Sequence, residues 1–265
     1  MATWTHGVCE TNDVGLHYCR TGGDKPPVVL LHGLMGSGAC WTLLARALER
    51  DWDVIMPDAR GHGDSSAPPR GYRYDDHASD VMGLIRGLEL NRPVLLGHSM
   101  GGMTAAVVAS EHAELLRGVA LIDPTFLTPQ RQREVSESDV AEQHRRALFM
   151  TKDELVALAR ARSPRRSLEI IERQAEARLK TRLEAFDVLT PPNPPYREVV
   201  SAIDVPCLLV IGDVPVVTLE MATELSGLNP RVRIEQIANA GHGLPFEQPE
   251  RLADVVSSFL RDCPP

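Results

Sequence analysis

The chain has 265 residues, a length typical of one large α/β domain. Hydrophobic residues make up 43% and charged residues 24% of the chain, which is ordinary globular usage and excludes a disordered, collagen-like or coiled-coil protein. A formal net charge of −8 argues against nonspecific binding to nucleic acid or anionic membranes, and no apolar run approaches the roughly 18 residues of a membrane span.

The five cysteines are odd in number and widely scattered, with no C-x-x-C spacing. We therefore expect free thiols in a reducing compartment rather than a disulfide framework. The first residues lack a basic region followed by an apolar run, so no secretory signal is expected. Together these features predict a cytoplasmic protein.

The predicted elements begin with an antiparallel hairpin, in which residues 3–10 and 15–19 flank the turn signal Asn12-Asp13. Further along, short continuous apolar runs alternate with amphipathic segments, as expected for strands buried on both faces of a parallel sheet. The runs are 28–31, 54–56, 94–96, 119–122 and 208–211, and a final strand is predicted at 232–237. The helical patterns fall at about 40–50, 75–89, 100–113, 218–228 and 249–261. This order predicts an α/β fold with a mostly parallel sheet and helices on both faces.

Residues 126–195 break this alternation, because they contain no strand-like run and their apolar residues recur at helical spacing. The segment closes with Pro191-Pro192-Asn193-Pro194-Pro195, which stops any helix. We predict a helical lid over 126–195, inserted into a core domain made of 1–125 and 196–265. Ordinary sheet-covering helices are the alternative.

The most specific motif is Gly97-His98-Ser99-Met100-Gly101, between the predicted strand ending at Leu96 and the helical run beginning near 100. A strand that turns into a helix this abruptly strains the central residue and raises its side chain above the sheet edge. Glycines two positions before and after remove Cβ atoms that would clash. The motif predicts that Ser99 is a nucleophile; a tight turn with a helix-capping serine is the alternative.

A serine hydroxyl needs a base within hydrogen-bonding reach. Among nine histidines, His242 is the candidate, because it follows the last predicted strand and has glycines on both sides. Oxyanion charge needs preorganised donors, for which we expect the backbone N–H groups of Met100 and Leu34. The His32-Gly33 pair would let the Leu34 N–H turn toward the site. Trp41 and Phe126 are candidates for lining an acyl pocket or for the core.

In these motifs the chain resembles the α/β-hydrolases: HGLMGSG at 32–38, DARGHGDS at 58–65, GHSMGG at 97–102 and AGHGLPFEQPE at 240–250, in the family's order. The resemblance implies an eight-stranded mostly parallel sheet, a helical cap after strand 6 and a Ser-His-acid triad. Serine at the elbow favours serine chemistry over that of dehalogenases and epoxide hydrolases, which carry Asp there. The DARGHGDS segment is expected mainly to shape a turn, and His98 to be a packing residue.

The acid of the triad is where the sequence departs from the family pattern. Relatives usually carry it after strand 7 in G-x-x-D, which places Pro215 at the expected position. Either Asp213 serves, or the acid is Asp123, after strand 6 as in some members. We favour Asp123 and expect the other carboxylate to cap a helix or pair with an arginine.

We therefore expect a lid-covered serine hydrolase acting on a carboxylic ester or lactone of a small, largely apolar molecule. No metal-ligand or nucleotide-binding pattern is present in the sequence, so no metal and no cofactor are expected. The expected partner is a small-molecule substrate, with no nucleic acid and no membrane. The resemblance also leaves open a C–C bond hydrolase, a cofactor-free lyase, or a slow-turnover sensor of a small ligand.

Overall fold

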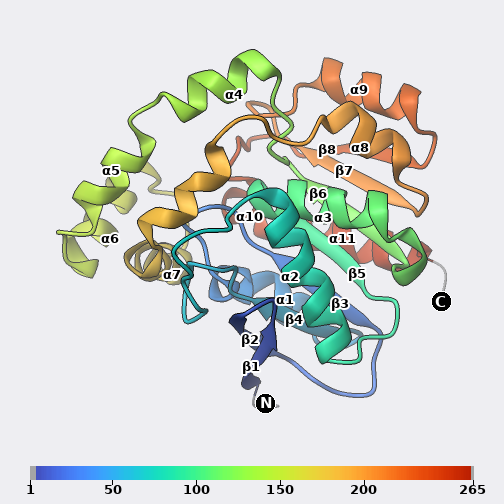
Figure 1. The fold of residues 1–265 in the computed structure, drawn as a ribbon, viewed down its shortest axis with the longest axis horizontal. Helices are drawn as coiled ribbons and strands as arrows, with labels where there is room; N and C mark the ends of the chain where they lie inside the picture. The colour runs from blue at the N-terminus through green and yellow to red at the C-terminus, as the bar shows by residue number, and fades with distance from the viewer. Residues whose placement is uncertain (1–3, 264–265) are drawn as a thin grey trace.

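The apolar runs, the predicted hairpin and the predicted final strand form one eight-stranded sheet in the computed structural model, which describes residues 4–263 (Figure 1). The strand order is β1-β2-β4-β3-β5-β6-β7-β8, and all pairings from β4 to β8 are parallel. The bounds are β1 Thr5–Thr11, β2 Val14–Arg20, β3 Pro27–Leu31, β4 Asp53–Pro57, β5 Val94–His98, β6 Gly118–Ile122, β7 Cys207–Ile211 and β8 Val232–Gln236. The predicted fold class is confirmed.

The antiparallel part of the sheet is the predicted hairpin, whose second strand also pairs antiparallel with β4. Its two-residue turn consists of Asn12 and Asp13, with φ of 47° and 60°, and Thr11 pairs with Val14 across it. Positive φ at both turn residues matches the right-handed twist of the flanking strands. Thr3, the expected first residue of the hairpin, lies outside the described residues.

Helices cover both faces of the sheet, and successive residues of each parallel strand point into opposite layers. In β3, Val29 and Leu31 belong to the apolar cluster that also contains residues of α2, α3, α8 and α9, whereas Val28 and Leu30 belong to the cluster that contains residues of α1 and α11. This two-sided burial explains why the strands read as continuous apolar runs. The helices of the two layers are α1 Thr42–Leu48, α2 Tyr74–Gly87, α3 Met100–Glu111, α8 Tyr196–Ala202, α9 Leu219–Leu228 and α11 Pro249–Asp262.

The lid segment, residues 126–195, follows β6 and lies outside the sheet along its whole described length. It contains α4 Pro129–Ser136, α5 Val140–Ala147, α6 Lys152–Arg162, α7 Leu168–Lys180 and the 3₁₀ segment η3 Leu183–Leu189. A small apolar cluster of Ala147, Leu155 and Ala175 joins three of these helices. Figure 1 shows α4 to α7 at the upper and left edge of the molecule, away from the hairpin.

The five cysteines are buried and free, as the sequence predicts; they are Cys9, Cys19, Cys40, Cys207 and Cys263. Within residues 4–263 no helix combines the length and the apolar character that crossing a bilayer requires.

A buried ion pair ties the loop after β4 to α2. The Arg60 guanidinium donates to both carboxylate oxygens of Asp80, at 2.6 and 2.5 Å, and the two residues are 5% and 4% exposed. Removing one partner of such a pair leaves an uncompensated buried charge. Asp80→Ala is therefore expected to lower the free energy of unfolding in urea by about 3–5 kcal/mol.

The matched control for this prediction is Glu224→Ala, which breaks an exposed pair with Arg197. We expect that variant to lose far less stability than Asp80→Ala, because solvent screens exposed pairs. Equal losses in the two variants would contradict a stabilising role for the buried pair.

Candidate active site

Ser99 occupies a sharp turn between a strand and a helix. β5 ends at His98 and α3 begins at Met100, so a single residue connects the two elements. Ser99 has φ 55° and ψ −118°, a conformation that is rare for a residue with a side chain. Such strain persists only where the surroundings fix it, and it clusters at functional sites.

The two glycines that flank Ser99 are required by close backbone contacts. A Cβ on Gly97 would lie 2.1 Å from the Gly101 carbonyl oxygen, and a Cβ on Gly101 would lie 2.3 Å from the Leu31 carbonyl oxygen. Neither approach is compatible with a side chain. The G-x-S-x-G pattern of the sequence is thus a packing requirement of this turn.

His242 lies between β8 and the short helix α10 (Leu244–Glu247), in the loop where the sequence places it. Its Nε2 is 3.0 Å from the Oγ of Ser99, and its Nδ1 is 2.6 Å from Oδ2 of Asp123. With a carboxylate beside Nδ1, the proton is assigned to Nδ1, which leaves Nε2 free to accept the serine proton. The three side chains therefore form a continuous hydrogen-bonded chain.

Asp123 directly follows β6 and is fully buried, with a positive φ of 38°. Besides the imidazole, its carboxylate accepts hydrogen bonds from the backbone N–H groups of Val216 and Val217, each at 2.9 Å. These charge-assisted bonds hold the carboxylate in one orientation and satisfy a buried charge.

The other candidate acid, Asp213, has a different environment. It is exposed, and its Oδ2 accepts from the Asn239 backbone N–H at 2.6 Å, while its Oδ1 accepts from the Gln236 side chain at 3.3 Å. The expectation that the second carboxylate would cap a helix or pair with an arginine is wrong. Asp213 instead fixes the turn that leaves β8, at Asn239, three residues before His242 in the same loop.

His98 supports the backbone of His242, a role that the sequence did not reveal. Its Nε2 donates to the His242 carbonyl oxygen at 2.7 Å, across 144 residues of sequence. Burial lowers the pKa of His98 to about 3, with a further contribution from the charge of His242. His98 is therefore neutral at physiological pH, and its single ring proton is held in the hydrogen bond to the His242 carbonyl oxygen.

A second unpredicted support links the lid segment to the same loop. Glu247 accepts the Gly241 N–H at 2.8 Å through Oε2 and an Arg166 N–H at 2.5 Å through Oε1. One carboxylate thereby connects the residue before His242 to a lid arginine.

Leu34 and Met100, the predicted oxyanion donors, both line a cavity beside Ser99. Met100 is the first residue of α3, so its N–H has no acceptor within that helix. The loop that carries Leu34 packs directly on the serine, because a Cβ on Gly33 would lie 3.0 Å from the Ser99 Cβ. His32 holds this loop by donating to the Gly33 carbonyl at 2.8 Å and accepting the Ala59 N–H at 2.9 Å.

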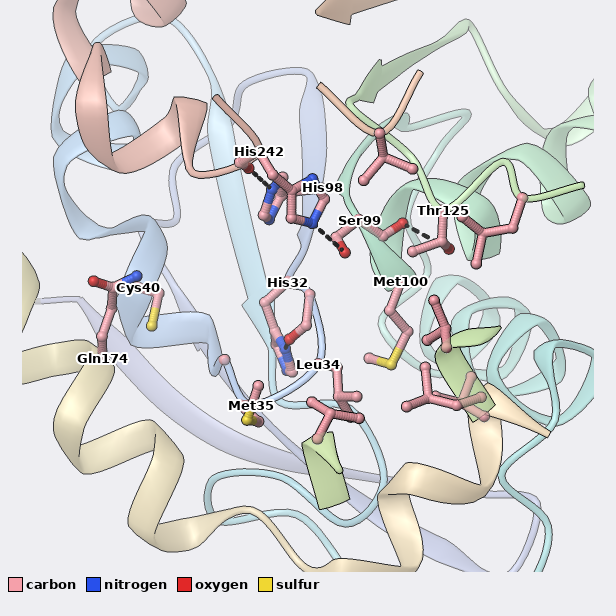
Figure 2. Close-up of a pocket in the computed structure, with 18 of the residues that line it drawn as sticks. His32, Leu34, Met35, Cys40, His98, Ser99, Met100, Thr125, Gln174 and His242 are labelled. Atoms are coloured by element: carbon pink, nitrogen blue, oxygen red, sulfur yellow. Dashed lines mark hydrogen bonds between the residues drawn. The ribbon is translucent and has the colours of Figure 1, made fainter. Parts of the chain in front are cut away.

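The cavity has a volume of about 870 Å³, lies at the carboxyl ends of the parallel strands and is lined in part by residues of the segment 126–195. Figure 2 shows Ser99, His242, His32 and Leu34 among its lining side chains. Trp41 and Phe126 also line the cavity, and both are buried. Each residue is therefore part of the cavity wall and of the apolar core. Most other lining side chains are apolar; they include Met35, Leu127, Val135, Val140, Leu155, Ile171, Val188 and Leu189.

The DARGHGDS segment shapes the turn after β4. Asp58 accepts the Gly38 and Asp64 N–H groups and pairs with His17, and His62 accepts the Met35 N–H. His17, Asp58 and Asp64 are the one group in residues 4–263 with metal-type ligand atoms within 4.8 Å of one another. These atoms already have protein partners, since Asp64 also pairs with Lys180, and none of the three residues lines the cavity.

Comparisons with known proteins agree on one family. The model of the "Alpha/beta hydrolase family" matches residues 28–255. The chain is 29% identical to the sn-1-specific diacylglycerol lipase ABHD11 of Mus musculus, over 92% of this chain and 85% of that protein. It is 26% identical to the N-formylmaleamate deformylase of Pseudomonas putida, over 96% of each. The crystal structure of the enol-lactonase from Burkholderia xenovorans LB400 has the same fold, with a TM-score of 0.79, 24% identity, and coverage of 96% of this chain and 100% of that one.

Proposed function

The chain belongs to the alpha/beta hydrolase family, and from this membership we propose that it is a serine hydrolase that cleaves a carboxylic ester or lactone of a small, largely apolar molecule. The proposal is consistent with the names of similar proteins, which include a lipase, a deformylase and an enol-lactonase. Each of these names denotes transfer of an acyl group to water. The observation that carries the proposal is the hydrogen-bonded chain of Ser99, His242 and Asp123 at the wall of a cavity.

In the proposed mechanism, His242 Nε2 takes the Ser99 proton as Oγ attacks the substrate carbonyl carbon. The buried Asp123 carboxylate keeps the imidazole in the required tautomer and stabilises the imidazolium that forms. The backbone N–H groups of Met100 and Leu34 are assigned to the oxyanion, with the N-terminal end of α3 adding favourable potential. His242 then protonates the leaving alcohol, and an acyl-enzyme remains on Ser99.

The second half of the reaction repeats these steps with water as the nucleophile. His242 takes a proton from water, the hydroxide attacks the acyl carbon, and Ser99 leaves with its proton restored. The apolar cavity walls favour an acyl or alcohol part with hydrocarbon character, because burial of apolar surface favours binding. The mechanism uses only groups of the chain and needs no cofactor.

The direct test is steady-state and burst kinetics on a panel of activated short-chain esters, lactones and β-diketones. Steady turnover of esters or lactones, with an initial burst of leaving group, supports the proposal. Turnover of β-diketones alone would replace it with C–C bond hydrolysis on the same residues. Ligand-induced stabilisation with almost no turnover of any compound would instead identify a small-molecule sensor.

Substrate preference is expected to depend on the lid segment. Ile171 is a buried lid residue that lines the cavity. Ile171→Ala enlarges the cavity and is expected to raise the ratio of kcat/KM for 4-nitrophenyl octanoate over 4-nitrophenyl butyrate by about tenfold, the lower end of what a hydrophobic pocket discriminates. Equal kcat losses on both esters would contradict a specificity role for the lid segment.

A further inference from the structure

The charge of the cavity wall is opposite to the charge of the protein. The chain carries a net charge of −8, yet the described residues that line the cavity include no aspartate or glutamate and two arginines, Arg131 and Arg178. An arginine that faces a cavity without an acid beside it gives that cavity a positive potential. The wall therefore attracts an anionic ligand.

Both arginines project from lid helices that line the cavity along one face. On α7, Ile171, Gln174, Ala175 and Arg178 follow the spacing of one helical face, and all four line the cavity. Among residues 4–263, the Arg178 side chain has one hydrogen-bond partner, the Gln143 carbonyl oxygen, to which an η nitrogen donates at 3.4 Å. Its charged end is therefore positioned by α5 and α7 together.

Arg178 lacks the partner that a half-buried guanidinium normally has. Within residues 4–263 it forms no salt bridge, and its Nε is buried without a hydrogen-bond partner. Burial and the like charge of Arg162 both lower its pKa. A buried donor left unsatisfied costs free energy that a ligand can recover.

Arg131, on α4, differs in this respect. It is exposed and donates to Glu134 on the next turn of the same helix, at 2.9 Å. Its charge is thus partly neutralised within α4, and Arg178 is the stronger candidate for binding an anion.

We propose that the natural substrate carries a carboxylate on its acyl part and that Arg178 of the lid segment binds this carboxylate. The inference rests on the proposed ester hydrolysis. It specifies that the substrate is amphipathic, with a hydrocarbon part and one charged end. The apolar walls contact a hydrocarbon spacer between the carbonyl that Ser99 attacks and the charged end that Arg178 holds. A planar guanidinium suits this task, because it donates two parallel hydrogen bonds to a carboxylate.

The test compares two 4-nitrophenyl esters with the same adipoyl chain: mono-4-nitrophenyl adipate, which is an anion, and 4-nitrophenyl methyl adipate, which is neutral. The wild-type protein is expected to have a kcat/KM about tenfold or more higher for the anion. Arg178→Met is expected to reduce kcat/KM for the anion about 10- to 100-fold more than for the neutral ester, the range for loss of a charged hydrogen bond. The loss should lie in KM, because the carboxylate contact is equal in the ground and transition states.

Two further variants distinguish a direct contact between Arg178 and the substrate carboxylate from a general effect of changing the lid segment. Arg178→Lys keeps the positive charge and is expected to restore part of the anion preference. Arg133→Met removes an exposed arginine of α4 that does not line the cavity, and its preference should equal that of the wild type. Equal losses on both esters in Arg178→Met, or no anion preference in the wild type, would overturn the inference while leaving ester hydrolysis established.

If the panel of esters shows no hydrolysis, binding of the anion can still be measured without turnover. Calorimetry on the Ser99→Ala protein compares monomethyl adipate, an anion, with dimethyl adipate. Tighter binding of the anion that is lost in the Ser99→Ala/Arg178→Met double variant supports the carboxylate site independently of catalysis. Equal binding of the two compounds overturns it.

Discussion

Ser99→Ala is expected to lower kcat for an activated ester by about 10⁶-fold, the loss seen when a serine hydrolase loses its nucleophile. Without Oγ no acyl-enzyme forms, and His242 has no hydroxyl to deprotonate. The fold should be retained, because among residues 4–263 the Ser99 hydroxyl has one hydrogen-bond partner, His242, at 3.0 Å. The measurement is kcat on 4-nitrophenyl butyrate, with circular dichroism and Tm recorded on the same samples.

The matched control is Ser110→Ala, which removes a hydroxyl from the same helix. Ser110 donates to the Val107 carbonyl in the last turn of α3 and does not line the cavity. Its kcat should stay within about twofold of the wild type, as expected for a substitution far from the site. Ordinary turnover in Ser99→Ala would refute the nucleophile assignment.

Asp123→Asn has the second-largest expected effect, a decrease in kcat of about 10⁴-fold, by analogy with loss of the triad acid in a serine protease. The amide has no negative charge to stabilise the imidazolium, and its NH₂ group favours the tautomer that places the His242 proton on Nε2. In that tautomer the imidazole cannot accept the serine proton. The measurement is kcat on the same ester, together with the free energy of unfolding.

Asp213→Asn is the control for that variant, because it changes the same functional group on the neighbouring strand. Asp213 is exposed, and its carboxylate contacts Gln236 at the end of β8 and Asn239 in the turn that follows, so we expect a change in kcat of about twofold or less. If the Asp213 variant lost more activity than the Asp123 variant, the two assignments would be exchanged.

Much of the fold follows from local sequence patterns. Residues 28–31 and 94–96 form continuous apolar runs because their strands are covered on both faces, and this burial is readable without knowing the neighbours. The hairpin is equally local, since Asn12 and Asp13 tolerate the positive φ that its turn requires.

The placement of Ser99 and His242 also follows from local signals. The glycines around Ser99 indicate a turn so tight that a Cβ at their positions would clash with the backbone. The glycines around His242 indicate a loop at the same edge of the sheet. The choice between Asp123 and Asp213 could not be settled locally, because both follow neighbouring parallel strands. What distinguishes them is the set of hydrogen bonds that Asp123 receives from Val216, more than 90 residues away, and from the imidazole.

The supports around the site depend on contacts that have no sequence signature. His98 donates to the carbonyl of His242, and Arg166 of the lid segment shares Glu247 with the loop before His242. The absence of an acid beside Arg178, within the described residues, likewise requires the arrangement of α5 and α7 to be known. These features arise from packing between distant segments, which periodicity and motifs do not encode.

The most direct test of the central claim, that Ser99 is an activated nucleophile, is covalent labelling with a fluorophosphonate followed by peptide mass spectrometry. We expect a phosphonate adduct on Ser99, with labelling that slows by orders of magnitude in His242→Ala. An unlabelled Ser99 in folded wild-type protein, or an adduct confined to another residue, would contradict it.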